Sequence, residues 1–250
     1  MQKAFIFYQN SGYWFLLLMP LVLIGFYPTY FAVLLKPTPS IIHLHFSLMA
    51  MWVAMLIVQP FLYKYKKLRL HRPIGKVSYV LVPLLLITAY FMIRFSYYRF
   101  IGDIEQRIST GSLQADHHQV LKEAASYEAI AFLYFAWLGS FYTLAIINRR
   151  PSFVHARYMV AAALTMLGPT VDRIAYNSIK VEKLGNAIPI ECVSFFIADC
   201  VLGFLLWKDY RNKRPTKTLL VSLLIFFLGQ VIYFLVKRTD TWQNIVSSIM

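Results

Sequence analysis

The chain has 250 residues, of which 59% are hydrophobic and 14% are charged, and its mean hydropathy is +0.57. A soluble domain carries about 25% charged residues, so this composition excludes a water-soluble globular protein, and it also excludes a disordered chain. The net charge of +14 would indicate nucleic-acid binding in a soluble protein, but the basic residues fall in short loops between apolar segments, and we expect no nucleic-acid partner.

Seven apolar segments are each long enough to cross a bilayer as a helix, which takes about 20 residues. None of them alternates polar and apolar residues, so a membrane β-barrel is excluded. We predict an all-α, polytopic membrane helix bundle that forms a single domain over residues 1–250 and has the lipid bilayer as its partner. In chain order, the predicted spans are 13–35, 41–63, 77–100, 127–148, 154–178, 187–207 and 218–236.

Basic residues concentrate in the second, fourth and sixth loops, which hold more than half of the 25 lysines and arginines. The positive-inside rule places these loops in the cytoplasm. The sequence therefore predicts an N-terminus inside, a C-terminus outside and residence in a bacterial cytoplasmic membrane. The basic residues of these loops are Lys64, Lys66, Lys67, Arg69, Arg72 and Lys76, then Arg149, Arg150 and Arg157, then Lys208, Arg211, Lys213, Arg214 and Lys217.

Two of the connecting segments carry local predictions. Gly75 follows the basic residues of the second loop and is expected to permit a tight turn into the third span. Residues 101–126 form the longest loop. Its second half has helical spacing from Ser112, a possible N-cap, and is predicted to extend the fourth span outward.

Four of the six histidines fall near the outer face in this topology. His117 and Glu128 are eleven residues apart on one predicted helix, about 20° around it, so they share a face. Imidazole and carboxylate groups suit a transition metal, and the candidate ligands are His43, His45, His117, His118 and Glu128. The alternatives are that His117 and His118 are simply solvated, and that either His43 or His45 makes only a hydrogen bond at the membrane interface.

Asp172, Arg173 and Asp199 are among the charged residues that lie inside predicted spans, where ionisable groups are costly and usually functional. Asp199 is predicted near mid-membrane, and Asp172 and Arg173 near the outer end of the fifth span. We assign these three candidate catalytic or proton-carrying roles, with an interfacial charge pair or a lipid headgroup contact as the alternative for Asp172 and Arg173. Asp209 falls in a basic loop and is expected to be hydrated and less important.

The second span and its following loop, HLHFSLMAMWVAMLIVQPFLYKYKKLRLHRPIGK, resemble a pattern in uncharacterised bacterial multi-pass membrane proteins, and HARYMVAAALTMLGPTVDR resembles another segment of the same group. A more distant resemblance is to transmembrane b-type di-haem cytochromes, on His45, Gln59-Pro60, His71 and Gly75. That resemblance implies two haem b groups on opposite sides of the membrane. One would be ligated by His45 with His117 or His118, and the other by His71 with His155.

The sequence departs from the cytochromes because their partner histidines lie within spans, whereas the third, sixth and seventh spans here have no histidine. The layout also resembles seven-span zinc hydrolases, but the last span lacks the two histidines that they use. The leading hypothesis is a haem-binding or metal-binding membrane protein that moves electrons or helps to assemble a respiratory oxidase, with respiratory-chain components as partners. The alternatives are a metal-dependent enzyme acting on a lipid-like substrate and a small proton-coupled transporter.

Overall fold

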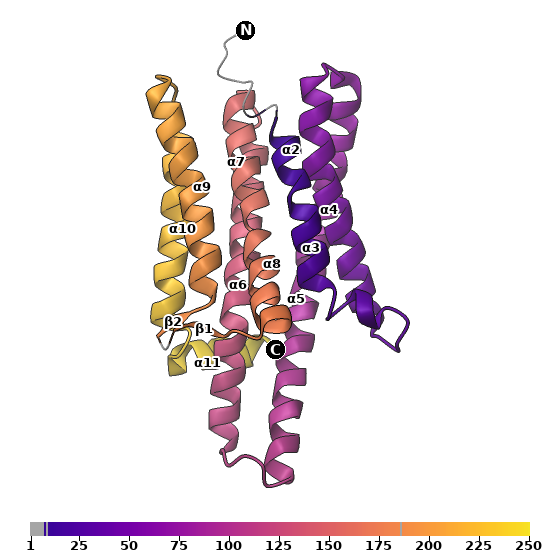
Figure 1. Ribbon diagram of the computed structural model, residues 1–250, viewed down its shortest axis with the longest axis vertical. Coiled ribbons are helices and arrows are strands. Elements are labelled where there is room, and N and C mark those ends of the chain that lie inside the picture. Colours follow the sequence, from indigo (N-terminus) through magenta and orange to yellow (C-terminus); the bar gives the residue numbers. More distant parts are fainter. Residues whose placement is uncertain (1–7, 9, 186) are drawn as a thin grey trace.

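The computed structural model describes residues 8, 10–185 and 187–250, and over these it is all-α apart from one antiparallel pair of two-residue strands (Figure 1). The first half of the chain forms α2 (Ser11–Leu16), α3 (Leu18–Phe26), the 3-10 turn η2 (Phe31–Val33), α4 (Ser40–Lys64), α5 (Leu68–Ser109) and α6 (His117–Ile147). The second half forms α7 (Ser152–Leu164), α8 (Leu167–Arg173), the π-helix η3 (Ile174–Ile179), β1 (Lys183–Leu184), β2 (Ile188–Pro189), α9 (Glu191–Arg211), α10 (Lys217–Val236) and α11 (Asp240–Ile249).

Four helices in the described part of the chain, α4, α5, α6 and α10, are long and apolar enough to cross a membrane, and Ser11–Phe26 forms a shorter apolar segment. The protein is therefore an integral membrane protein built as a helical bundle, as the composition predicts. Two other predicted spans coincide with interrupted helices, α2 with α3 and α7 with α8, and the remaining one coincides with α9, a 21-residue helix that carries several charged residues.

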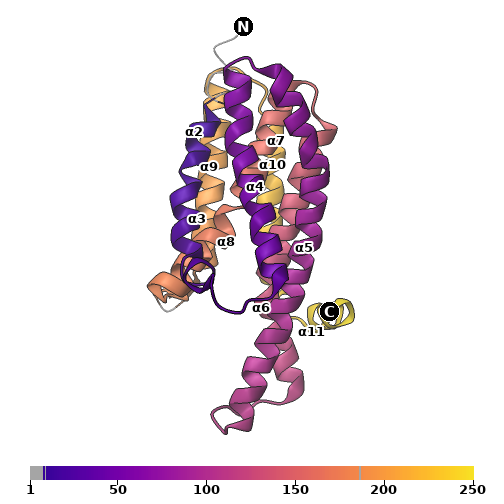
Figure 2. The ribbon, with the colours of Figure 1, turned by 90° about the vertical axis from the view of Figure 1, so that its right-hand side faces the viewer.

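Helix α6 lies at the centre of the bundle and packs against α5, α7 and α10 (Figures 1 and 2). The core beside it is formed by large side chains that are almost completely buried, among them Trp52, Phe141 and Phe226. Other large apolar residues face outward, as Phe196 and Leu235 do. Apolar side chains on both the inside and the outside are typical of helices that lie in lipid.

The turns that join α4 to α5, α6 to α7 and α9 to α10 lie at one end of the bundle (Figures 1 and 2). The first of these turns is shorter than predicted, because α5 already begins at Leu68 and Lys66 makes the turn with a positive φ of 59°. Gly75 therefore lies inside a helix, and its prediction as a turn residue is wrong. An added Cβ at Gly75 would lie 3.7 Å from Gln59 Nε2, so Gly75 contributes to helix packing.

Beyond the opposite end of the bundle, α5 and α6 continue together as a hairpin (Figures 1 and 2). The helical extension of α6 is confirmed, but its N-cap is Asp116 and not Ser112. The Asp116 carboxylate accepts from the Gln119 N–H at 2.7 Å, and the Gln119 side chain accepts from the Asp116 N–H at 3.3 Å. This reciprocal capping box stabilises the start of the helix more than a lone serine would.

Helix α11, which has no counterpart among the predicted spans, lies across the bundle near the base of the hairpin (Figure 1). Trp242 Nε1 donates to the Ala125 carbonyl at 2.7 Å, and Val246 is completely buried against α6. Lys122 Nζ donates to Asp240 at 2.6 Å, and this hydrogen bond lowers the pKa of the Asp240 carboxyl. These contacts hold α11 against the hairpin.

Candidate functional site

The two inner histidines are both fixed by backbone carbonyl groups. His71, in the first turn of α5, contacts the Gln59 carbonyl through Nδ1 at 3.2 Å. His155, in the first turn of α7, contacts the Ala145 carbonyl through Nδ1 at 2.8 Å. A carbonyl oxygen can only accept a hydrogen bond, so each Nδ1 carries the proton. In the neutral rings, each Nε2 therefore holds a lone pair.

Both histidines lie in the first turn of helices that start at the same end of the bundle (Figures 1 and 2). Both side chains are half-buried, and the Tyr63 ring packs edge-on against His71 with centroids 5.9 Å apart. Neither Nε2 has a hydrogen-bond partner among the described residues. An imidazole held by an Nδ1–H to carbonyl bond, with a free Nε2, is the usual arrangement of a histidine that ligates a metal.

Gln59 of α4 completes what we call the inner histidine site, defined by Gln59, His71 and His155. Both polar atoms of the Gln59 side chain, Oε1 and Nε2, are buried and have no partner within the described chain. An unsatisfied buried amide is costly. The site is therefore built to offer hydrogen bonds as well as two imidazole nitrogens.

A buried polar path continues from the inner histidine site into the bundle. Ser78 lies seven residues beyond His71 on the same face of α5, and its hydroxyl is 2.9 Å from the Tyr142 hydroxyl of α6. The Tyr142 ring packs edge-on against Trp52, with centroids 5.8 Å apart. Trp52 is completely buried, and its Nε1–H has no acceptor among the described residues. This second orphaned donor lies two helical turns from Gln59 on α4.

The outer histidines are not brought together. His43 bonds to Tyr30 at 3.2 Å, and His45 bonds to Thr88 at 3.0 Å, both through Nδ1. His117 begins α6 at the far end of the hairpin, where it is 72% exposed and lies 3.7 Å from Glu105 (Figure 2), and the neighbouring His118 is exposed. Within the described residues, no three His, Cys, Asp or Glu side chains form a group that could hold a metal ion.

His117 and Glu128, predicted to share a helix face as candidate metal ligands, are not brought together either. The two residues do share a helix, but His117 lies in the exposed hairpin, whereas Glu128 is 2% exposed inside the bundle. Glu128 Oε1 is buried without a partner in the described chain. The structure thus separates Glu128 from the hairpin histidines.

Asp172 and Arg173 end α8 and point to different neighbours. The Arg173 guanidinium lies over the Phe26 ring of α3, 4.7 Å from its centroid. Asp172 is 8% exposed, and its Oδ2 accepts a hydrogen bond from the Tyr134 hydroxyl of α6 at 2.6 Å. Asp172 Oδ1 is buried and has no partner among the described residues. The structure thus assigns Asp172 to the bundle core, although the sequence left an interfacial charge pair open.

Glu191 and three residues that the sequence analysis missed form a network beside Asp172. Glu191 opens α9, and its Oε1 accepts from the Tyr233 hydroxyl at 2.7 Å and from Lys237 Nζ at 3.1 Å. Tyr134 is 3.4 Å from the Ser194 hydroxyl, one turn after Glu191. We call Asp172, Glu191, Tyr134, Tyr233 and Lys237 the carboxylate cluster. Lys237, a single lysine just past the last span, was the one signal in the sequence for this network.

Asp199 lies apart from the carboxylate cluster. Its Oδ2 accepts a hydrogen bond from Gln230 Nε2 of α10 at 3.0 Å, and its Oδ1 is buried without a partner in the described chain. Within the described part of the chain, no hydrogen bond or ion pair joins Asp199 to Asp172 or Arg173. The polar residue opposite it, Gln230, is the only mid-helix amide of α10, so the pairing follows from the packing of α9 on α10 and not from any motif.

Asp209 is not hydrated, contrary to its prediction as a loop residue. Helix α9 continues to Arg211, and this extra turn carries Asp209 into the bundle, where it is 1% exposed. Arg157 of α7, itself 2% exposed, donates to Asp209 Oδ2 from Nη2 at 2.6 Å and from Nε at 2.9 Å. Tyr8 donates to the same oxygen at 2.8 Å, and Arg214 lies 3.3 Å from Oδ1.

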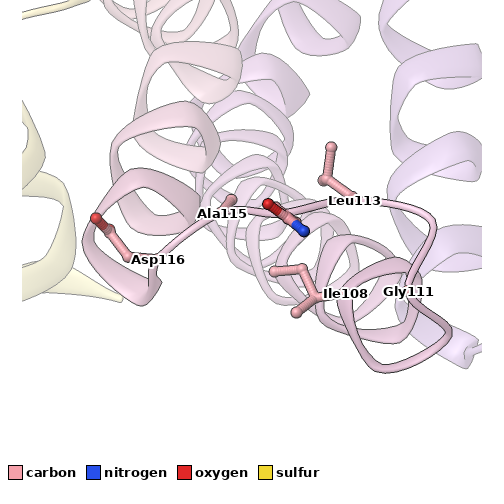
Figure 3. Close-up of a pocket in the computed structure, with 6 residues that line it drawn as sticks. Ile108, Gly111, Leu113, Ala115 and Asp116 are labelled. Carbon is pink, nitrogen blue, oxygen red and sulfur yellow. The ribbon is translucent and has the colours of Figure 1, made fainter.

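A hollow at the tip of the hairpin is unsuited to the predicted chemistry. It lies between the end of α5 and the start of α6, and its lining is Ile108, Gly111, Leu113, Gln114, Ala115 and Asp116 (Figure 3). Its one ionisable side chain, Asp116, is already used to cap α6. The residues that could hold a cofactor lie in the bundle, at the inner histidine site.

Comparison of the chain with protein-family models, with curated proteins and with solved structures gives no match.

Proposed function

We propose that this integral membrane protein binds one haem b at the inner histidine site and carries electrons across that end of the bundle. The observation that carries the proposal is the pair of anchored imidazoles, each with its Nδ1–H held by a carbonyl group and its Nε2 free. The resemblance of His71, Gln59 and Gly75 to the cytochrome pattern supports the same residues. The outer histidines, which do not meet, give no support for a second haem.

The number of ligands favours haem over a bare metal ion. A structural zinc site takes four protein ligands, and the inner histidine site offers two imidazoles. The described residues provide no group of three possible ligands anywhere in the bundle. Haem iron receives four of its ligands from the porphyrin, so two axial imidazoles are enough.

The residues of the site have separable roles in this proposal. His71 and His155 would bind through Nε2, and the carbonyl groups of Gln59 and Ala145 would fix the orientation of their rings. The buried Gln59 amide and the Trp52 N–H would supply hydrogen bonds to polar groups of the cofactor. A bound haem would supply reversible one-electron transfer. We propose respiratory-chain components as the electron partners at this face.

Purification in mild detergent after expression with ample iron and haem precursor tests the proposal. We expect a Soret band that shifts on dithionite reduction, and about one haem per chain. His71→Ala and His155→Ala should each remove the spectrum, because each takes away one of two axial ligands. His43→Ala and His118→Ala are matched controls and should leave the spectrum unchanged.

Two outcomes would contradict the haem proposal. A folded protein free of haem after such expression would leave the carboxylate cluster as the functional centre, and the proton-coupled transporter would replace the electron carrier. A spectrum that survives His71→Ala but not His45→Ala would move the cofactor to the other end of the bundle.

We propose that the end carrying the three basic turns faces the cytoplasm, with seven helical segments crossing the membrane. Single cysteines at the exposed positions Lys67 and Lys217 should then resist an impermeant thiol reagent in intact cells, whereas a cysteine at the exposed Gln114 should react. Cys192 and Cys200, which are free thiols, must be replaced first. Labelling of Lys67→Cys as readily as Gln114→Cys would reverse the orientation.

A further inference from the structure

A groove with a volume of about 740 Å³ runs along the outside of the bundle, where the start of α4 meets α5. This volume lies in the range of small-molecule sites, about 300–1,000 Å³. Its lining consists of three apolar residues, one tyrosine and two arginines: Ile41, Phe91, Phe95, Tyr98, Arg94 and Arg99. The groove is far along α5 from the inner histidine site and is independent of the proposed haem.

The lining of the groove has two positive charges and no carboxylate. Arg94 lies over the Tyr98 ring, 5.5 Å from its centroid, and makes no ion pair with any described residue. Arg99 is 3.9 Å from Asp103, and both side chains are 70% exposed, so this contact is loose. His43, the nearest titratable residue of α4, is bonded to Tyr30. The groove thus attracts an anion.

The position of the arginines on α5 indicates where the anion comes from. Arg94 lies within the predicted span 77–100 and on the outside of the bundle. A guanidinium facing hydrocarbon is costly and is accommodated when it reaches the headgroup level. The C-terminal part of α5 leaves the bundle for the hairpin (Figure 2). Arg94 and Arg99 therefore lie where hydrocarbon gives way to lipid headgroups.

We propose that this groove binds a phospholipid with an anionic headgroup. Arg94 and Arg99 pair with the phosphate, because guanidinium groups bind phosphate oxygens through two parallel hydrogen bonds. Phe91, Phe95 and Ile41 hold the upper part of an acyl chain. The lipid phosphate also neutralises the charge of Arg94, which has no ion-pair partner among the described residues.

The experiment measures retained lipid by native mass spectrometry, on protein stripped of lipid and mixed with phosphatidylglycerol or phosphatidylcholine. We expect preferential retention of phosphatidylglycerol that weakens as salt is raised. The Arg94→Gln/Arg99→Gln variant should bind it about 30-fold more weakly. Arg107→Gln, which changes an exposed arginine of α5 outside the groove, is the matched control and should bind normally.

Further arms keep the proposal testable if the double variant does not fold. Phe95→Ala should weaken lipid retention with both arginines present, because it removes the chain contact and keeps the charge. Inorganic phosphate should not displace the lipid, and its displacement by phosphate would identify a free-anion site. Equal retention of the two lipids by the wild-type protein, or unchanged retention in the double variant, would overturn the proposal.

Discussion

Asp209→Asn is expected to destabilise the protein by about 3–5 kcal/mol, the usual cost of removing one partner from a buried ion pair. The asparagine would leave the Arg157 guanidinium buried at 2% exposure with no full counter-charge. Arg157 already has one buried nitrogen, Nη1, without an acceptor among the described residues. Unfolding of the purified protein in detergent, followed by near-UV circular dichroism, gives the free-energy change.

Asp199→Asn is the matched control, since it makes the same chemical change nearly three turns earlier on α9. It should cost far less, because Gln230 can hydrogen-bond an amide as well as a carboxylate. Arg157→Met/Asp209→Leu should recover much of the loss, because it removes both charges of the Arg157–Asp209 pair. If Asp209→Asn were no more harmful than Asp199→Asn, the buried ion pair would not hold α7 to α9.

Gly168→Ala is expected to cost about 1–3 kcal/mol, the usual penalty of overpacking a core. Gly168 lies in α8, and a Cβ there would overlap the ring and the hydroxyl of Tyr134. Tyr134 cannot move away without losing its 2.6 Å hydrogen bond to Asp172. The substitution should therefore lower the midpoint of thermal unfolding in detergent and disturb the carboxylate cluster at the same time.

Gly203→Ala on α9 provides the comparison. An added Cβ at Gly203 meets no atom within 4 Å, so the substitution should be neutral or slightly stabilising, as alanine usually is in a helix. An equal loss of stability from both variants would mean that the contact with Tyr134 does not explain the effect. Tyr134→Phe with Gly168→Ala should still be destabilised, because the ring remains in place.

The membrane class and most helix positions could be predicted because they depend on apolar length alone. Each predicted span coincides with a helix or a pair of helices in the structure. The inner histidines could be predicted as neighbours because both lie in the first turn of helices that start at the same end of the bundle. Their carbonyl partners, Gln59 and Ala145, could not be, because backbone acceptors leave no trace in a sequence.

The wrong predictions for His117 with Glu128 and for Asp209 have one physical cause. The sequence does not show where a helix leaves the bundle. Helical periodicity placed His117 and Glu128 on one helix face, but it does not show that α6 extends beyond the bundle and forms a hairpin with α5 (Figure 1). Asp209 was misjudged in the opposite sense, since one more turn of α9 takes it into the core. Local sequence defines faces, and the neighbouring helices decide which faces are covered.

The buried pair of Arg157 and Asp209 also constrains how the chain is inserted during synthesis. The four long apolar helices have the length and hydropathy to partition into lipid one at a time. Helix α7 carries the buried Arg157, and α9 carries the carboxylates of Glu191, Asp199 and Asp209, so both helices enter hydrocarbon at a cost. The two charges are 52 residues apart, so α7 emerges from the ribosome well before α9, and Arg157 has no Asp209 to pair with until α9 follows.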